Sequence, residues 1–149
     1  MNILALDPGT TETAFVLWDG RRILCAGHYP NADVRQVLIA KNYDLVACEM
    51  IASYGMAVGR EVFETCVWIG RFLEVAMGDT RLVYRRDVKL HLCHSPRAKD
   101  ANVRQALIDR LGPQGTKKNP GATYGMKSHL WAALAVAVYA FDTREARPE

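Results

Sequence analysis

Residues 3–20, ILALDPGTTETAFVLWDG, set the start of the fold. The apolar run Ile3–Leu6 ends at Asp7 and is broken by a Pro-Gly pair, which predicts a buried strand followed by a turn. A second β-rich run, Thr13–Trp18, follows, and the Asp-Gly pair after it predicts a hairpin turn into a third run, Arg22–His28. The chain therefore opens with three strands in a meander.

The rest of the chain alternates helical and strand-like segments. The spacing of apolar residues predicts a helix, a strand, a long helix and a further strand, at Asp33–Lys41, Asp44–Cys48, Met56–Met77 and Arg81–Arg85. Two short helices and a closing alanine- and valine-rich helix follow, at Asp87–Leu92, Ala101–Leu111 and Lys127–Phe141. Residues 112–126, GPQGTKKNPGATYGM, predict a loop. The sequence thus predicts an α/β fold: a mixed five-stranded sheet, made of the meander and parallel strands, flanked by helices.

Length and composition indicate one globular domain. The chain has 149 residues, half of them hydrophobic and 23% charged, which is enough to bury one core. We expect a single domain over residues 1–142 and a frayed, charged tail over 143–149. The sequence has no run of 18 apolar residues and its four cysteines are widely spaced, so we expect a cytoplasmic protein without a membrane span. His91, Cys93 and His94 lack a second ligand pair, which argues against a zinc site.

Charge is distributed unevenly along the chain. Residues 81–127 carry eleven Lys or Arg against three Asp, whereas the remainder carries eight bases against thirteen acids. A basic part that could hold phosphate and an acidic part that could hold metal suit a nuclease, although a solvated basic face without a partner is the alternative. The candidate phosphate contacts are Arg85, Arg86, Lys89, Arg97, Lys99, Arg104, Lys117 and Lys118.

Two carboxylates stand at strand ends. Asp7 ends the first predicted strand and Glu49 ends the fourth, so parallel neighbouring strands would bring both to one edge of the sheet. Two converging carboxylates repel each other unless a divalent cation lies between them, which makes the pair a candidate metal site. His129 and Ala132 are one turn apart on the closing helix, so His129 could reach that cation. Alternatively, His129 lines the start of a buried helix.

Several motifs occur in the order found in RuvC-type Holliday-junction resolvases. They are LALDPGT, the apolar strand ending in Glu49, RRDVKLHL, PRAKDANVRQAL and HLWAALAVA. Together they span most of the chain, and it resembles the compact, phage-type members most. The resemblance implies an RNase H-like fold, a symmetric homodimer, and two divalent cations (Mg²⁺ or Mn²⁺) held by four residues. Asp7, Glu49 and His129 match three of those positions, but Ala132 stands where the family has a carboxylate.

The resemblance also implies a reaction and a substrate. Two-metal phosphodiester hydrolysis of four-way or other branched DNA is expected, in a bacterial or phage-infected cell and without a small-molecule cofactor. In this scheme Asp7 bridges both metals, Glu49 holds one, and His129 helps to orient the other. Because Ala132 cannot bind a cation, catalysis is expected to be impaired unless another ligand takes its place. An imidazole ligand favours Mn²⁺ over Mg²⁺.

Tyr54 lies in the IASYGM segment, which we expect to open the long helix. An aromatic side chain there could stack on an unpaired base at the branch point, or it could cap the helix. The apolar residues of the long helix, among them Phe63, Trp68 and Phe72, exceed what one face against a sheet requires, so the helix is also expected to form the dimer interface.

Three other functions fit parts of the sequence. A YqgF-like RNase acting on structured RNA shares the D-x-G-T turn and a similar length. A non-catalytic module that binds branched DNA is favoured by Ala132. An actin-like ATPase has a similar phosphate-binding turn but needs two lobes, and this chain has residues for one.

Overall fold

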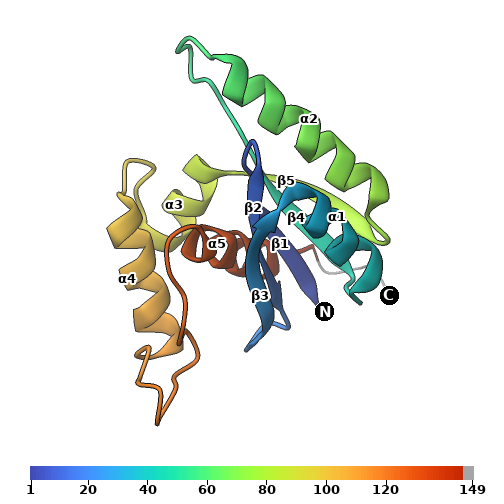
Figure 1. Cartoon of the computed structure of the whole chain (residues 1–149). Helices are drawn as coiled ribbons and strands as arrows, with labels where there is room; N and C mark the ends of the chain where they lie inside the picture. Colours follow the sequence, from blue (N-terminus) through green and yellow to red (C-terminus); the bar gives the residue numbers. More distant parts are fainter. Residues whose placement is uncertain (146–149) are drawn as a thin grey trace.

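The computed structural model describes residues 1–145, which form one five-stranded sheet covered by helices (Figure 1). The strands are β1 (Ile3–Asp7), β2 (Glu12–Trp18), β3 (Ile23–Pro30), β4 (Leu45–Met50) and β5 (Asp79–Tyr84). The helices are α1 (Asn31–Ala40), α2 (Arg60–Val75), α3 (Arg85–Cys93), α4 (Asp100–Leu111) and α5 (His129–Asp142). The sheet order is β3-β2-β1-β4-β5, with β1–β2 and β2–β3 antiparallel and β1–β4 and β4–β5 parallel. The predicted meander and the parallel position of the fourth strand are confirmed.

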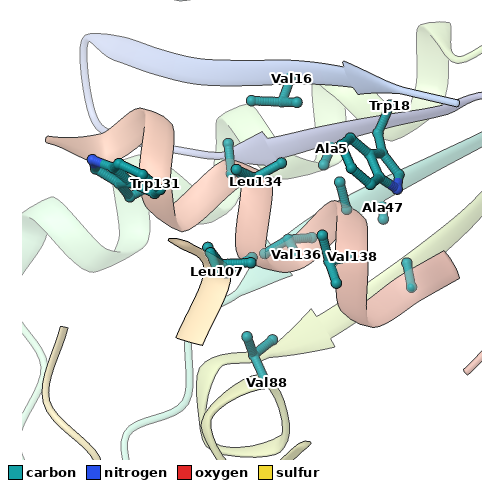
Figure 2. Close-up of a cluster of buried hydrophobic side chains, with 14 of the residues drawn as sticks. Ala5, Val16, Trp18, Ala47, Val88, Leu107, Trp131, Leu134, Val136 and Val138 are labelled. Carbon is teal, nitrogen blue, oxygen red and sulfur yellow. The ribbon is translucent and has the colours of Figure 1, made fainter. Parts of the chain in front are cut away.

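Alternation along β1 divides the core into two layers. Ile3 and Ala5 belong to the cluster built around α5, whereas Leu4 and Leu6 belong to the cluster beneath α1 and α2. Helix α5 is apolar nearly all round because it lies between the sheet and the helices α3 and α4 (Figure 2). The helix packs along the sheet and places its first residue, His129, at the sheet edge, where the His129 side chain is 62% exposed.

The turn after β1 is fixed by glycine and by a buried polar network. A Cβ added at Gly9 would lie 2.4 Å from the carbonyl oxygen of Glu12, so a side chain there would displace the backbone. The Thr13 hydroxyl accepts a hydrogen bond from the Gly9 amide (3.3 Å) and donates one to Asn31 Oδ1 (2.6 Å). Asn31 Nδ2 in turn donates to the Gly9 carbonyl (3.0 Å). These contacts hold the backbone two residues after Asp7.

The long helix is shorter than predicted, and Phe63 lies outside its buried face. It begins at Arg60, because the preceding segment contains Gly55 in the left-handed region and Gly59 at the N-cap. Its buried residues are Thr65, Ile69 and Phe72, while Phe63 is 62% exposed. Phe72 is therefore a core residue, whereas Phe63 faces away from the core.

Other boundaries also shift. The fifth strand covers Asp79–Tyr84, so Arg85 starts α3 instead of ending the strand. The closing helix starts at His129, two residues later than predicted. The predicted loop over 112–126 is confirmed, with one isolated bridge between Gly115 and Pro120. No helix within residues 1–145 is both long enough and apolar enough to span a bilayer.

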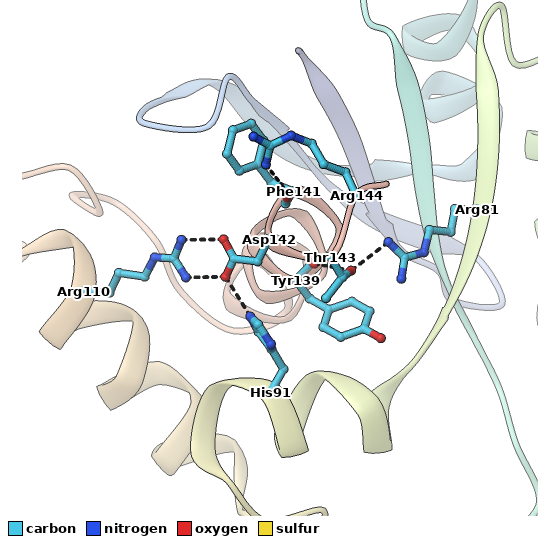
Figure 3. A network of polar contacts seen from close by, with 8 residues as sticks. All are labelled: Arg81, His91, Arg110, Tyr139, Phe141, Asp142, Thr143 and Arg144. Carbon is cyan, nitrogen blue, oxygen red and sulfur yellow. Dashed lines mark hydrogen bonds and ion pairs between the residues drawn. The ribbon is translucent and has the colours of Figure 1, made fainter. Parts of the chain in front are cut away.

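The last turn of α5 is tied to its neighbours (Figure 3). The Asp142 carboxylate contacts His91 Nε2 of α3 at 2.7 Å and accepts hydrogen bonds from both terminal nitrogens of Arg110 on α4. Arg81 Nη1 of β5 donates to the hydroxyl of Thr143 at 2.8 Å. The predicted frayed tail over 143–149 thus begins with a residue that is held in place, and its last four residues, 146–149, lie outside the described part of the chain.

Candidate functional site

The candidate site lies at the carboxyl edge of the two central parallel strands. Leu6 of β1 pairs with Cys48 of β4, so Asp7 and Glu49 occupy the next positions, on the sheet face covered by α5. His129 begins α5, and its Nδ1 lies 2.9 Å from Asp7 Oδ2. The structure therefore places His129 against Asp7, with Glu49 at the end of the neighbouring strand at the same edge of the sheet.

Burial and proximity alter the proton affinity of the two carboxyls. Burial raises the pKa of Glu49 to about 8, and its hydrogen bond to Asp7 and the charge of Asp7 act in the same direction, against a smaller opposite effect of Arg85. Burial also raises the pKa of Asp7, although the hydrogen bond from Glu49 and the charge of Arg85 oppose it. Two largely buried carboxyls at neighbouring strand ends are costly to ionise together, so a cation between them would stabilise both.

A cavity of about 370 Å³ opens beside these carboxyls. Its walls come from β4, from the helices α3, α4 and α5, and from the residues just before α5. Its polar lining is formed by Glu49, Arg85, Lys89, Asp100, Arg104, Ser128 and His129, and Ala132, Ala135 and Val136 form part of its apolar wall. Arg85 Nη1 lies 3.6 Å from Glu49 Oε1, and the same guanidinium pairs with Asp100. The cavity thus combines acidic and basic groups beside the strand ends.

The donor set fits one divalent cation better than two. Asp7 and Glu49 supply two oxygen donor groups with raised proton affinity, and His129 supplies a nitrogen next to them. Ala132 lines the cavity with a methyl group only. Within residues 1–145, no group of three or more His, Cys, Asp or Glu side chains is arranged to hold a metal ion as it stands. Binding would require the Asp7–His129 and Glu49–Arg85 contacts to rearrange.

The predicted phosphate contacts divide into three groups. Arg85, Lys89 and Arg104 line the cavity. Arg86, Arg97 and Lys99 are exposed on α3 and on the turn into α4. Lys117 and Lys118 are exposed in the loop beyond the C-terminal end of α4, at the opposite end of that helix from the cavity residue Asp100 (Figure 1). The structure therefore does not join all eight residues into one track along the cavity.

Tyr54 does not open the long helix. It lies in a turn six residues before α2, has a positive φ of 49°, and is 60% exposed. A helix-capping role is excluded, because the N-cap is Gly59.

Two residues near the site were missed by sequence reasoning. Asp100 pairs with Arg85 in the cavity, and the visible signal was an acid inside the most basic segment of the chain. The ring of His28 lies 5.4 Å from the ring of His129, centroid to centroid. Its position follows from strand register, since Asp7 pairs with Ala14 and Ala14 pairs with His28 across the meander. A register-based view of the first three strands would have found His28.

Comparisons with known proteins bear on the fold. No protein-family model matches the chain, and no curated protein matches it significantly. The solved structure of RuvC from Thermus thermophilus is similar with a TM-score of 0.71 and 21% identity, over 95% of this chain and 93% of that one. RuvC of the same organism in complex with a Holliday junction substrate is similar with a TM-score of 0.68 and 20% identity, over 97% and 95% of the two chains. The chain therefore has the RNase H-like fold of RuvC, as its sequence predicts.

Proposed function

We propose that the protein is a divalent-metal-dependent endonuclease that cuts branched DNA. The observation that carries this proposal is the pair of largely buried carboxyls, Asp7 and Glu49, at the carboxyl edge of parallel strands and beside a cavity with basic walls. Two neighbouring carboxyls favour the binding of a divalent cation, and the basic side chains of the cavity wall favour the binding of a phosphodiester. The RuvC structure with the same fold is in complex with a Holliday junction substrate, which supports a four-way junction as the first substrate to test.

The net reaction adds one water across a phosphodiester. The water oxygen bonds to phosphorus, the bond from phosphorus to O3′ breaks, and the leaving O3′ takes up a proton. Asp7 and Glu49 would hold a cation that activates the water and stabilises the leaving oxygen. His129, which lies 2.9 Å from Asp7, would turn from that contact to offer the cation a nitrogen ligand. Arg85, Lys89 and Arg104 bind the phosphate oxygens from the cavity walls.

A second copy of the chain is part of the proposal. Four-way junctions need two cuts related by a two-fold axis, which suits a symmetric dimer. Phe63 and Val67 of α2 are 62% and 56% exposed, an apolar surface that a partner helix could cover. Sedimentation of the purified protein should give the mass of a dimer.

The activity is tested with three labelled nucleic acids: a four-way DNA junction, a linear duplex with the sequence of one arm pair, and an RNA hairpin. Each is incubated with Mn²⁺, with Mg²⁺ and with chelator. We expect the junction to be cut at least tenfold faster than the duplex, faster in Mn²⁺ than in Mg²⁺, and not at all in chelator. Preferential cleavage of the hairpin would favour a YqgF-like RNase, and cleavage in chelator would exclude the metal site.

A second candidate function is a module that binds branched DNA without cutting it. Ala132 favours it, because the cavity wall offers no carboxylate at that position. Gel-shift binding of the junction in chelator, with no cleavage in either metal, would establish this alternative.

A further inference from the structure

Arg85 and Ala132 line the same cavity as Glu49. The Arg85 guanidinium lies between two acids: its Nη1 is 3.6 Å from Glu49 Oε1, and its Nη2 pairs with Asp100 at the start of α4. Lys89 Nζ lies 3.9 Å from the same Asp100 oxygen. Arg85 is thus anchored from a second helix, and its charge stands next to one of the two carboxyls proposed to bind metal.

Charge balance around the cavity favours one cation. Asp7 and Glu49, when both are ionised, carry the two negative charges that match a single divalent ion. The charge of Asp100 is already opposed by Arg85. A second divalent ion would lie near the guanidinium, without a carboxylate at position 132 to offset the repulsion.

We infer that Arg85 supplies the positive charge that a second cation would otherwise supply, and that each site binds one divalent ion. Asp100 is the positioning residue that holds Arg85 in the cavity. This inference rests on the proposed function and assigns a role to a residue of that same site.

In this proposal Arg85 is a catalytic residue, because from its place in the cavity wall its guanidinium would contact the scissile phosphate. A guanidinium presents several N–H donors in a fixed plane, so it can donate to two phosphate oxygens at once. During attack by water, negative charge grows on the phosphate oxygens, and a charge fixed in place stabilises it. A lysine keeps the charge but loses the paired donors. Arg85→Lys should therefore cut more slowly than the wild type and faster than Arg85→Gln.

The test counts Mn²⁺ ions bound per chain without DNA, by electron paramagnetic resonance of free Mn²⁺ and by calorimetry. Four proteins are compared: wild type, Ala132→Asp, Arg85→Gln, and the double variant. We expect one Mn²⁺ in the wild type and in each single variant, since in Ala132→Asp the new carboxylate pairs with Arg85. We expect two in the double variant, where the carboxylate is present and the guanidinium is gone.

Arg86→Gln is the matched control, because it removes the same charge from the next, exposed position of α3 and should leave the Mn²⁺ count at one. Two Mn²⁺ ions in the wild type, or in Ala132→Asp with Arg85 intact, would overturn the role of Arg85. If Ala132→Asp fails to fold, the cleavage rates of Arg85→Lys and Arg85→Gln still test the role of Arg85, and equal rates would overturn it. One Mn²⁺ without junction cleavage would refute the proposed function alone, whereas no bound Mn²⁺ would refute both.

Discussion

The two ends of α5 carry the same pair of residue types in opposite electrostatic states. At the N-terminal end, His129 contacts Asp7 at 2.9 Å, and Glu49 lies beside Asp7 at the end of the neighbouring strand. At the C-terminal end, His91 contacts Asp142 at 2.7 Å, and Arg110 donates to both oxygens of that carboxylate (Figure 3). The N-terminal end thus has two carboxyls near a single guanidinium, that of Arg85, which lies 3.6 Å from Glu49. The C-terminal end has one carboxyl in direct contact with both His91 and Arg110.

The difference appears in the proton affinities. Burial acts to raise the pKa of Asp142, but hydrogen bonds from Arg110 and His91 outweigh it, so the net pKa is lowered. At the other end burial prevails, and the pKa of Glu49 rises to about 8. A carboxylate whose charge is balanced by hydrogen bonds from neighbouring side chains stabilises the fold. Two neighbouring carboxyls whose charges are only partly balanced are available to bind a cation. The contacts of Asp142 are therefore structural, whereas Asp7 and Glu49 form the candidate catalytic site.

The largest difference is expected when each end loses one carboxylate charge. Asp7→Asn should lower the rate of junction cleavage roughly 10³-fold, a loss of about 4 kcal/mol of transition-state stabilisation, because the cation loses a ligand. Asp142→Asn, assayed well below its melting temperature, should change the rate severalfold at most. The measurement is single-turnover cleavage of a labelled junction in Mn²⁺. Equal losses in both variants would contradict the distinction between the two ends.

The next largest effect concerns the stability of the C-terminal end. Asp142→Asn should cost roughly 1.5–3 kcal/mol of unfolding free energy, because it weakens hydrogen bonds between charged partners. Since the pKa of Asp142 is lowered in the folded protein, this stabilisation is present above the ordinary carboxyl pKa and is lost as pH falls through the folded value. Urea unfolding at pH 7 and at pH 3 measures it. Asp109→Asn, which alters an exposed aspartate of α4, is the control. An equal loss of unfolding free energy in Asp109→Asn would contradict the stabilising role assigned to Asp142.

The smallest effect has the opposite sign. Glu49→Gln should stabilise the protein by about 1 kcal/mol at pH 9 in chelator, because it removes a buried charge that is costly there. The pKa of Glu49 is raised from 4.5 to about 8, so the wild type should lose stability progressively between those pH values. Thermal unfolding from pH 5 to pH 9 measures this. The exposed variant Glu74→Gln should keep the wild-type pH dependence, and an unchanged profile in Glu49→Gln would contradict the assigned pKa.

Sequence patterns predicted the sheet and the three residues at its edge because the signals are local. Apolar runs that stop at Asp7 and Glu49 mark strand ends, and parallel neighbours bring those ends together. The start of the closing helix then carries His129 to the same edge. The resemblance of the ordered motifs to RuvC pointed to the same fold, which the structural comparison confirms.

What the sequence did not predict depends on how helices are placed. The side chain of Arg85 enters the cavity because Arg85 starts α3 and does not end β5. The sequence prediction placed this boundary one residue too late, so it did not reveal the position of Arg85 in the cavity. The pairing of Arg85 with Asp100 joins two helices, so no local spacing reveals it. Lys117 and Lys118 looked equivalent to Lys89 by charge, but the direction of α4 carries them to its far end.

The most direct test of the metal site is anomalous scattering from crystals of the protein soaked in Mn²⁺. We expect one strong peak per chain between the carboxylates of Asp7 and Glu49, and no peak at the contact between His91 and Asp142. A peak at the His91–Asp142 end alone, or none at Asp7 and Glu49 at saturating Mn²⁺, would contradict the assignment of the sheet edge as the cation site.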